Sequence, residues 1–98
     1  MTITAAQNGT ALEVALEGRL DTVTAPELEA ELEKRMPDAD TLILDFGKLD
    51  YISSAGLRVL LNTHRTMSAK DGMKILNANE IVREVFDVTG FSNILELE

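Results

Sequence analysis

Several residue types are scarce or absent in this sequence of 98 residues, and each absence excludes a class of protein. There is no cysteine, which excludes disulfide bonds and thiolate chemistry and fits a reducing compartment. Tryptophan is absent, and only one tyrosine and three phenylalanines are present. The hydrophobic core must therefore be built mainly from leucine, isoleucine, valine and alanine.

Positive charge is also scarce, with 9 lysines and arginines against 17 aspartates and glutamates, for a formal net charge of -8. Nucleic acids and anionic membrane surfaces are bound by clustered lysine and arginine, so we expect neither as a partner. The first residues lack the basic segment and apolar stretch of a signal peptide, and no apolar run is long enough to cross a bilayer. We therefore expect a soluble, cytoplasmic protein with no membrane insertion.

The remaining composition is that of an ordinary globular protein, with 45% hydrophobic and 27% charged residues. The sequence contains no linker, repeat or low-complexity segment. This length and composition predict one domain spanning residues 1–98.

The first part of the chain predicts a β-hairpin. In residues 11–17, Leu12, Val14 and Leu16 alternate with smaller or charged residues, a period of two that indicates a half-buried strand. Residues 2–7 predict a second strand, joined to the first at Asn8-Gly9, a dipeptide typical of tight hairpins. Residues 18–21 are expected to form a connecting loop.

Three further segments predict strands. Residues 41–46 form a nearly continuous apolar run, which is typical of a strand covered on both faces. Residues 74–77 and 94–97 predict shorter strands.

Residues 24–27, with the sequence Thr-Ala-Pro-Glu, have the pattern of a capping box at a helix start, with the proline in the first turn. The predicted helix runs to about Met36, with Leu28, Leu32 and Met36 on one stripe, and ends before Pro37.

Two more helices are predicted. One starts at Ser53 or Ser54 and runs to about Lys70, and the other spans residues 80–89 and is closed by Gly90. Strands alternating with helices indicate an α/β fold with a mixed sheet of about four to five strands packed with three or more α-helices.

The segment from Asp45 to Arg58 carries the functional signal. It predicts a buried strand, a short loop over residues 47–52, and a helix whose N-terminus carries two hydroxyls, those of Ser53 and Ser54. Unpaired backbone N–H groups and the positive end of the helix dipole favour a capping serine there, and the same field can stabilise a phosphate on that serine. From these residues alone, a plain serine cap and a phosphorylation site both remain open.

The same segment resembles the signature of STAS domains of the anti-sigma factor antagonist family, in which a hydrophobic strand ending in Asp leads to a Ser-Ser-x-Gly-Leu or Asp-Ser-x-Gly-Leu helix start. The other resembling segments are Gly18-Arg19-Leu20-Asp21, Thr24-Ala25-Pro26-Glu27-Leu28, Gly72-Met73-Lys74-Ile75-Leu76-Asn77 and Val88-Thr89-Gly90-Phe91. These segments follow the family order over essentially the whole chain.

This resemblance implies a function and a site. In the family, the unphosphorylated antagonist binds a serine kinase that also serves as the anti-sigma factor, and the sigma factor is released. The kinase phosphorylates the serine two positions before the family's glycine, and a serine phosphatase acts on the phosphorylated form. Counting back from Gly56 gives Ser54, with Ser53 as the alternative because it stands where members often have Asp.

The resemblance also places residues 18–21 beside this serine. On a helical wheel, one stripe of the second helix is expected to face the core, formed by Leu57, Leu60, Leu61, His64 and Met67. Ala55 and Val59 fall on the opposite side and are expected to be exposed. The predicted partner surface is therefore Asp21, Ser53, Ser54, Ala55, Gly56 and Val59. The alternative for Asp21 is a turn residue that caps its own loop.

A phosphate adds about −1.5 to −2 charges, which would oppose docking of this helix end while the helix dipole limits damage to the fold. Replacing Ser54 by alanine is expected to cost about 1 kcal/mol for a lost cap.

Other functions fit the sequence less well. A serine hydrolase would need a histidine near 3 Å from the serine, but His64, the only one, lies ten residues after Ser54, about 15 Å along one helix. A response-regulator receiver would use Asp45, yet the acidic pair after the first strand is missing, so Asp45 is interpreted as a loop anchor. Phosphate-loop and Ca²⁺-loop spacings are absent, so no enzyme activity, cofactor or metal is expected.

One alternative stays within the same family. Some STAS domains are non-switching adaptors, for example a subunit of a lipid-transport ATPase complex or a component of a stress-signalling scaffold. An adaptor needs no phosphorylatable serine, so the presence of Ser53 and Ser54 favours the switch. The oligomeric state, monomer or weak dimer, stays open at this point.

Overall fold

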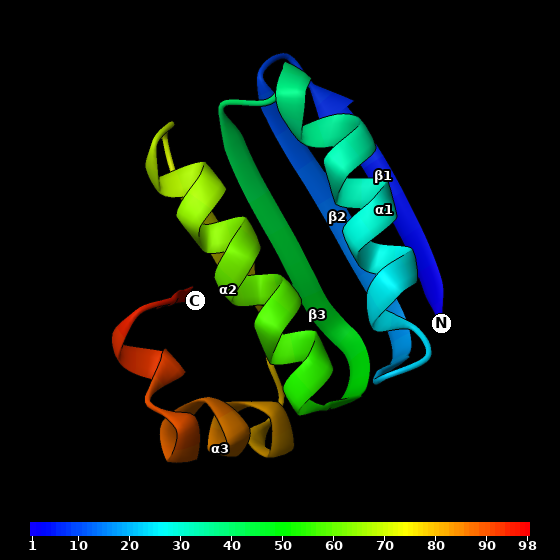
Figure 1. Cartoon of the computed structure of the whole chain (residues 1–98), viewed down its shortest axis with the longest axis vertical. Helices are drawn as coiled ribbons and strands as arrows, with labels where there is room; N and C mark the ends of the chain where they lie inside the picture. Colours follow the sequence, from blue (N-terminus) through cyan, green and yellow to red (C-terminus); the bar gives the residue numbers. More distant parts are fainter.

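The computed structural model describes residues 1–98 as one layer of strands and one of helices (Figure 1). The strands are β1 (Thr2–Asn8), β2 (Ala11–Leu20), β3 (Thr41–Ile52), β4 (Met73–Leu76) and β5 (Glu96–Leu97). The helices are α1 (Ala25–Arg35), α2 (Ser54–Ser68) and α3 (Glu80–Thr89), with short 3₁₀ turns at Met36–Asp38 and Phe91–Asn93. The predicted α/β fold with a mixed sheet is confirmed.

The five strands lie in sequence order in one sheet. β1 and β2 pair antiparallel as the predicted hairpin, and every later neighbouring pair is parallel. Right-handed crossovers between consecutive parallel strands place their helices on the same side of a sheet. α1 and α2 accordingly lie side by side in front of the sheet, and α3 lies below the N-terminal end of α2 (Figure 1).

Only one face of the sheet is fully covered, so the expectation that residues 41–46 are buried on both faces is wrong. In β3, Leu42, Leu44 and Phe46 are fully buried, whereas Ile43 and Asp45 between them are half-buried. In β2, the residues that point away from the helices over this stretch are Glu13, Ala15 and Glu17, and all three are exposed. Because the helices cover one side alone, the near-continuous apolar run of β3 does not reflect two-sided burial.

β2 and β3 are longer than the sequence pattern predicts, because residues 18–20 and 47–52 are strand rather than loop. The two strands stay paired as far as Leu20 and Ile52. The register shifts twice, and each time β3 carries one more residue than β2. Such bulges break the alternation of buried and exposed side chains, which is why these ends resemble loops in the sequence.

The remaining boundaries agree closely with prediction. α3 ends at Gly90, whose φ of 81° gives the left-handed helix cap. β5 begins two residues later than predicted, because Ile94 and Leu95 continue the turn that starts with the 3₁₀ segment Phe91–Asn93. The interpretation of Asp45 as a loop anchor is wrong, because Asp45 lies inside β3. Its Oδ1 accepts hydrogen bonds from the Gly47 N–H at 2.9 Å, at a register shift of β3, and from the Asn77 side chain at 3.1 Å, just after β4.

Candidate functional site

The candidate site lies where β2 and β3 end side by side. The Ser53 N–H donates to the Leu20 carbonyl at 2.8 Å, which joins the start of α2 to the end of β2. Asp21 directly follows Leu20, so its turn lies beside the first residues of α2. The structure therefore brings the predicted residues 21 and 53–56 together from two distant parts of the chain.

The two serines have different environments. Ser53 is the N-cap of α2: its backbone is extended, and its Oγ accepts a hydrogen bond from the Gly56 N–H at 3.4 Å. Ser54 is the first residue of the helix, is exposed, and has no side-chain hydrogen bond within the protein. The expectation that Ser54 caps the helix is wrong, because Ser53 caps it, and the Ser54 hydroxyl is left free.

Gly56 is buried, so it forms packing beneath the site rather than a surface for direct contact. A Cβ at this position would lie 2.7 Å from Leu20 Cγ and 2.9 Å from Ile52 Cγ1. A side chain there would push α2 away from the strand ends. Glycine therefore allows the start of α2 to lie directly against β2 and β3.

Asp21 organises its own turn. Its Oδ1 accepts hydrogen bonds from the N–H groups of Val23 and Thr24, each at 3.0 Å. These contacts, with the Thr24 N–H contributing most, hold the pKa of Asp21 below its ordinary value. The alternative that Asp21 caps its own loop is thus what the geometry shows, while its Oδ2 accepts no internal hydrogen bond and remains available to a partner.

The predicted capping box before α1 does not form. Thr24 is the N-cap of α1, but its side chain makes no capping hydrogen bond. Its Oγ1 instead accepts from the Asp21 N–H at 2.8 Å and donates to the Arg19 carbonyl at 2.7 Å. The Thr24 hydroxyl therefore braces the turn beside the site rather than the helix.

The expected exposure of Val59 is wrong. Val59 is 6% exposed, whereas Ala55 is half-buried at the edge of the core. α1 packs against the side of α2 that carries Val59, and the buried stripe also includes Thr63. Leu61 and His64, which were expected in the core, are only half-buried for the same reason.

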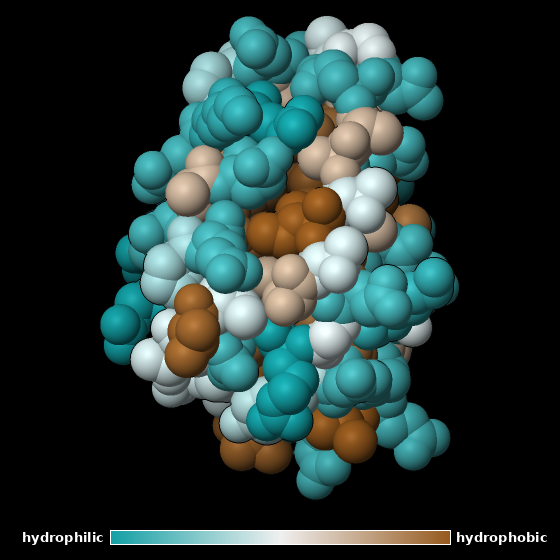
Figure 2. All heavy atoms as spheres, turned by 90° about the vertical axis from the view of Figure 1, so that its right-hand side faces the viewer, coloured by the Kyte–Doolittle hydropathy of each residue, from teal (hydrophilic) through white to brown (hydrophobic).

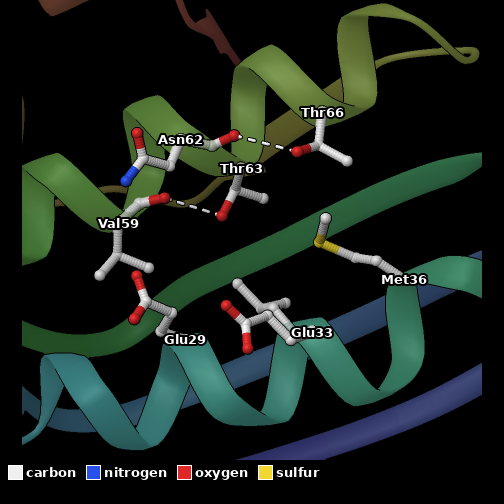
Figure 3. Close-up of a pocket in the computed structure, with 8 residues that line it drawn as sticks. Glu29, Glu33, Met36, Val59, Asn62, Thr63 and Thr66 are labelled. Atoms are coloured by element: carbon white, nitrogen blue, oxygen red, sulfur yellow. Dashed lines mark hydrogen bonds between the residues drawn. The ribbon is translucent and has the colours of Figure 1, made fainter.

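A groove between α1 and α2 was not predicted from the sequence (Figure 3). It has a volume of about 140 Å³, an apolar floor of Leu32, Met36 and Val59, and polar side chains along both edges. The sequence signal that could have found it is the spacing of Glu29 and Glu33, which puts two carboxylates on one side of α1.

Other kinds of site are not supported. The chain holds no cluster of three or more histidine, aspartate or glutamate side chains placed to bind a metal ion. His64 lies on the same continuous helix as Ser54, too far along it for a nucleophile–base pair. None of the helices combines the length and the apolar character needed to cross a membrane.

Comparison with known proteins agrees with this geometry. Residues 2–98 match the STAS domain family, and the chain therefore belongs to that family. A protein of Bordetella bronchiseptica with the name anti-sigma factor antagonist BtrV is 41% identical over 81 residues, which cover 81% of this chain and 70% of BtrV. The anti-sigma-B factor antagonist of Bacillus subtilis is 27% identical over 92 residues, covering 93% and 84% of the two chains. Within the STAS family, the chain belongs with the anti-sigma factor antagonists.

Solved structures show the same fold. An anti-sigma factor antagonist from Mycobacterium paratuberculosis superimposes with a TM-score of 0.89 at 24% identity, covering 98% of this chain and 83% of that one. The antagonist SpoIIAA in its unphosphorylated form gives a TM-score of 0.85 at 22% identity, covering 99% and 88%. SpoIIAA from Bacillus in its phosphorylated form gives 0.77 at 21% identity, covering 99% and 91%.

Proposed function

We propose that this protein is a phosphorylation-controlled anti-sigma factor antagonist that acts in the cytoplasm by binding rather than by catalysis. In the unphosphorylated form it binds an anti-sigma factor that is also a serine kinase, and the sigma factor is released. Phosphorylation of Ser54 by that kinase ends the binding, and a serine phosphatase restores it. The names of the relatives support the class of partner.

The observation that carries the proposal is the free, exposed hydroxyl of Ser54 at the first position of α2. A kinase needs access to a hydroxyl and a backbone that tolerates the added phosphate. Ser54 satisfies both requirements, whereas the Ser53 hydroxyl is engaged in capping the helix. Ser54 is therefore the phosphate acceptor in this proposal, and Ser53 the alternative acceptor.

A phosphate on Ser54 would alter binding more than folding. It would meet the positive end of the α2 dipole, and the exposed Arg58 lies one helical turn further on. The same charge would have to be desolvated or repelled in an interface centred on this helix end. The Asp21 carboxylate and the half-buried Ala55 complete this surface around Ser54.

Phosphosite mapping tests the acceptor. The protein, Ser53→Ala and Ser54→Ala are each incubated with the cognate kinase and ATP, and the sites are mapped by tandem mass spectrometry. Phosphate should enter at residue 54 in the wild type and in Ser53→Ala, and Ser54→Ala should take up none. Modification confined to Ser53 would reject the assignment.

Binding measurements test the switch. Calorimetric titration with the kinase should show affinity in Ser54→Ala within about threefold of wild type and at least about tenfold weaker binding in Ser54→Asp, because charge opposes docking. Both variants should unfold within about 0.5 kcal/mol of wild type, since the cap belongs to Ser53. Equal affinity of the two variants would contradict the switch and favour a non-switching adaptor.

A further inference from the structure

The groove between α1 and α2 has two carboxylates on one edge. Glu29 and Glu33 lie one turn apart on α1, and both side chains reach toward α2 (Figure 3). Neither carboxylate forms an ion pair with any residue of the chain. Like charges four residues apart on a helix repel each other, so this edge favours a cation that lies between them.

The opposite edge offers hydrogen-bond acceptors. The Thr63 hydroxyl donates its proton to the Val59 carbonyl at 2.7 Å, and the Thr66 hydroxyl donates to the Asn62 carbonyl at 3.3 Å (Figure 3). With those protons committed within α2, both oxygens can serve a ligand only as acceptors. Among the side chains that line the groove, the amide of Asn62 is the only donor that is not already used in a hydrogen bond within α2. The chemistry of the groove therefore suits a ligand rich in N–H donors.

The apolar floor and the volume of the groove further restrict the kind of ligand that it can hold. An apolar floor between charged edges suits a side chain with a methylene stem and a charged head. A cavity of about 150 Å³ accommodates benzene, so the groove, at about 140 Å³, accommodates a planar group the size of a guanidinium. A guanidinium also presents five N–H donors in a plane, which allows it to bind carboxylates and hydroxyls at once.

One cationic side chain of the protein lies close to this groove but forms its hydrogen bonds elsewhere. Lys70 lines a second hollow that shares Glu33, Met36 and Thr66 with the groove. Its ammonium donates to the carbonyls of Met36 at 2.9 Å and Ala39 at 2.7 Å. Lys70 is thus hydrogen-bonded to the two ends of the 3₁₀ turn that follows α1, and it forms no ion pair with Glu29 or Glu33.

We propose that this groove receives an arginine side chain of the anti-sigma factor. The identity of that partner rests on the function proposed above. The stem would pack on Met36 and Val59, and the guanidinium would bind Glu29 and Glu33. Val59 lies five residues after Ser54, about 7.5 Å along the helix axis, so a partner that covers Ser54 can also reach the groove.

A titration without any partner tests the groove itself. N-acetyl-arginine amide is added to the ¹⁵N-labelled protein, with N-acetyl-glutamine amide as the neutral control. Saturable shifts should centre on the amides of Thr63 and Thr66 for the arginine compound alone, and should disappear in the double variant Glu29→Gln/Glu33→Gln. Absent or evenly spread shifts would overturn the proposal.

Titration with the kinase tests the interface. Glu29→Gln/Glu33→Gln should bind about tenfold more weakly at low salt, with a smaller loss at high salt. The matched control is Glu80→Gln/Glu84→Gln, an exposed pair with the same spacing on α3, which should bind within about twofold of wild type.

The outcomes separate the two proposals. If Ser54→Asp loses binding and the groove variant does not, the arginine pocket is wrong and the switch stands. If the groove variant loses binding and Ser54→Asp does not, the switch is wrong and the arginine pocket stands. If the wild type binds no such kinase, the proposed function fails, and the arginine titration alone decides the groove.

Discussion

Single residues at the candidate site differ in the hydrogen bonds that they make within the protein. Ser53 and Ser54 are neighbours with the same side chain, yet one hydroxyl caps α2 and the other is free. Asp21 uses one carboxylate oxygen to hold its turn and leaves the second one exposed. A substitution at any of these positions must therefore be judged by both folding and binding.

The hydrogen bonds of Asp21 predict a pH dependence of stability. The Thr24 N–H is the main cause that holds the pKa of folded Asp21 below 3.8, its ordinary value. A lowered pKa means that ionised Asp21 stabilises the fold above the unfolded-state pKa, and that this contribution is lost as pH falls through the folded-state pKa. Asp21→Asn should therefore be less stable than wild type at neutral pH, and the difference should shrink below about pH 4.

Urea unfolding at neutral pH and near pH 3 measures this difference. Asp71→Asn, at an exposed position elsewhere on the surface, is the matched control and should show little difference at either pH. A stability difference for Asp21→Asn that is the same at both pH values would contradict the role assigned to the charge.

At the scale of elements, the packing of α1 against α2 determines which side of α2 is buried. Leu57, Leu60 and Met67 of the predicted core stripe are buried, but Leu61 and His64 are only half-buried. The presence of α1 rotates the buried side toward Val59 and Thr63. The same packing creates the groove between the helices. Contact between two helices thus decides both the core and the candidate binding surface.

Val59→Asp tests this packing. A carboxylate at a position only 6% exposed would lie beside Glu29 without a cationic partner, so we expect a loss of about 3 kcal/mol or more. For a domain of this size, that loss lowers the melting temperature by more than about 10 °C. Val23→Asp, the same change at a position 78% exposed, is the control and should melt close to wild type. A melt of Val59→Asp within a few degrees of wild type would show that α1 does not cover this position.

For the molecule as a whole, the dominant property is negative charge. The face in Figure 2 is mostly hydrophilic, with hydrophobic residues in small separate patches. The formal net charge of -8 is spread over a compact domain with a radius of gyration of 12.1 Å. Charge of one sign at this density destabilises the folded state through self-repulsion and attracts basic partner surfaces.

Moderate salt should therefore stabilise the protein. Raising NaCl from about 0.01 to 0.1 M shortens the Debye length from about 30 to about 10 Å, which screens repulsion across the domain. The melting temperature should rise by several degrees. A variant with glutamine at positions 29, 33, 80 and 84 carries four fewer negative charges and should respond less. A melting temperature that falls with salt would show that attractive pairs outweigh the self-repulsion.

The sequence by itself determined the elements whose signals are local. Alternation in residues 11–17, the Asn8-Gly9 turn, the helix starting at Ser53 or Ser54 and the stop at Gly90 all depend on neighbouring residues, and the structure confirms each of them. The tertiary structure decided the rest. The bulges that extend β2 and β3 and the burial of Val59 and Gly56 depend on residues distant in the chain. The groove also required α1 and α2 to be placed side by side, since each helix supplies only one of its edges and no local pattern records that contact.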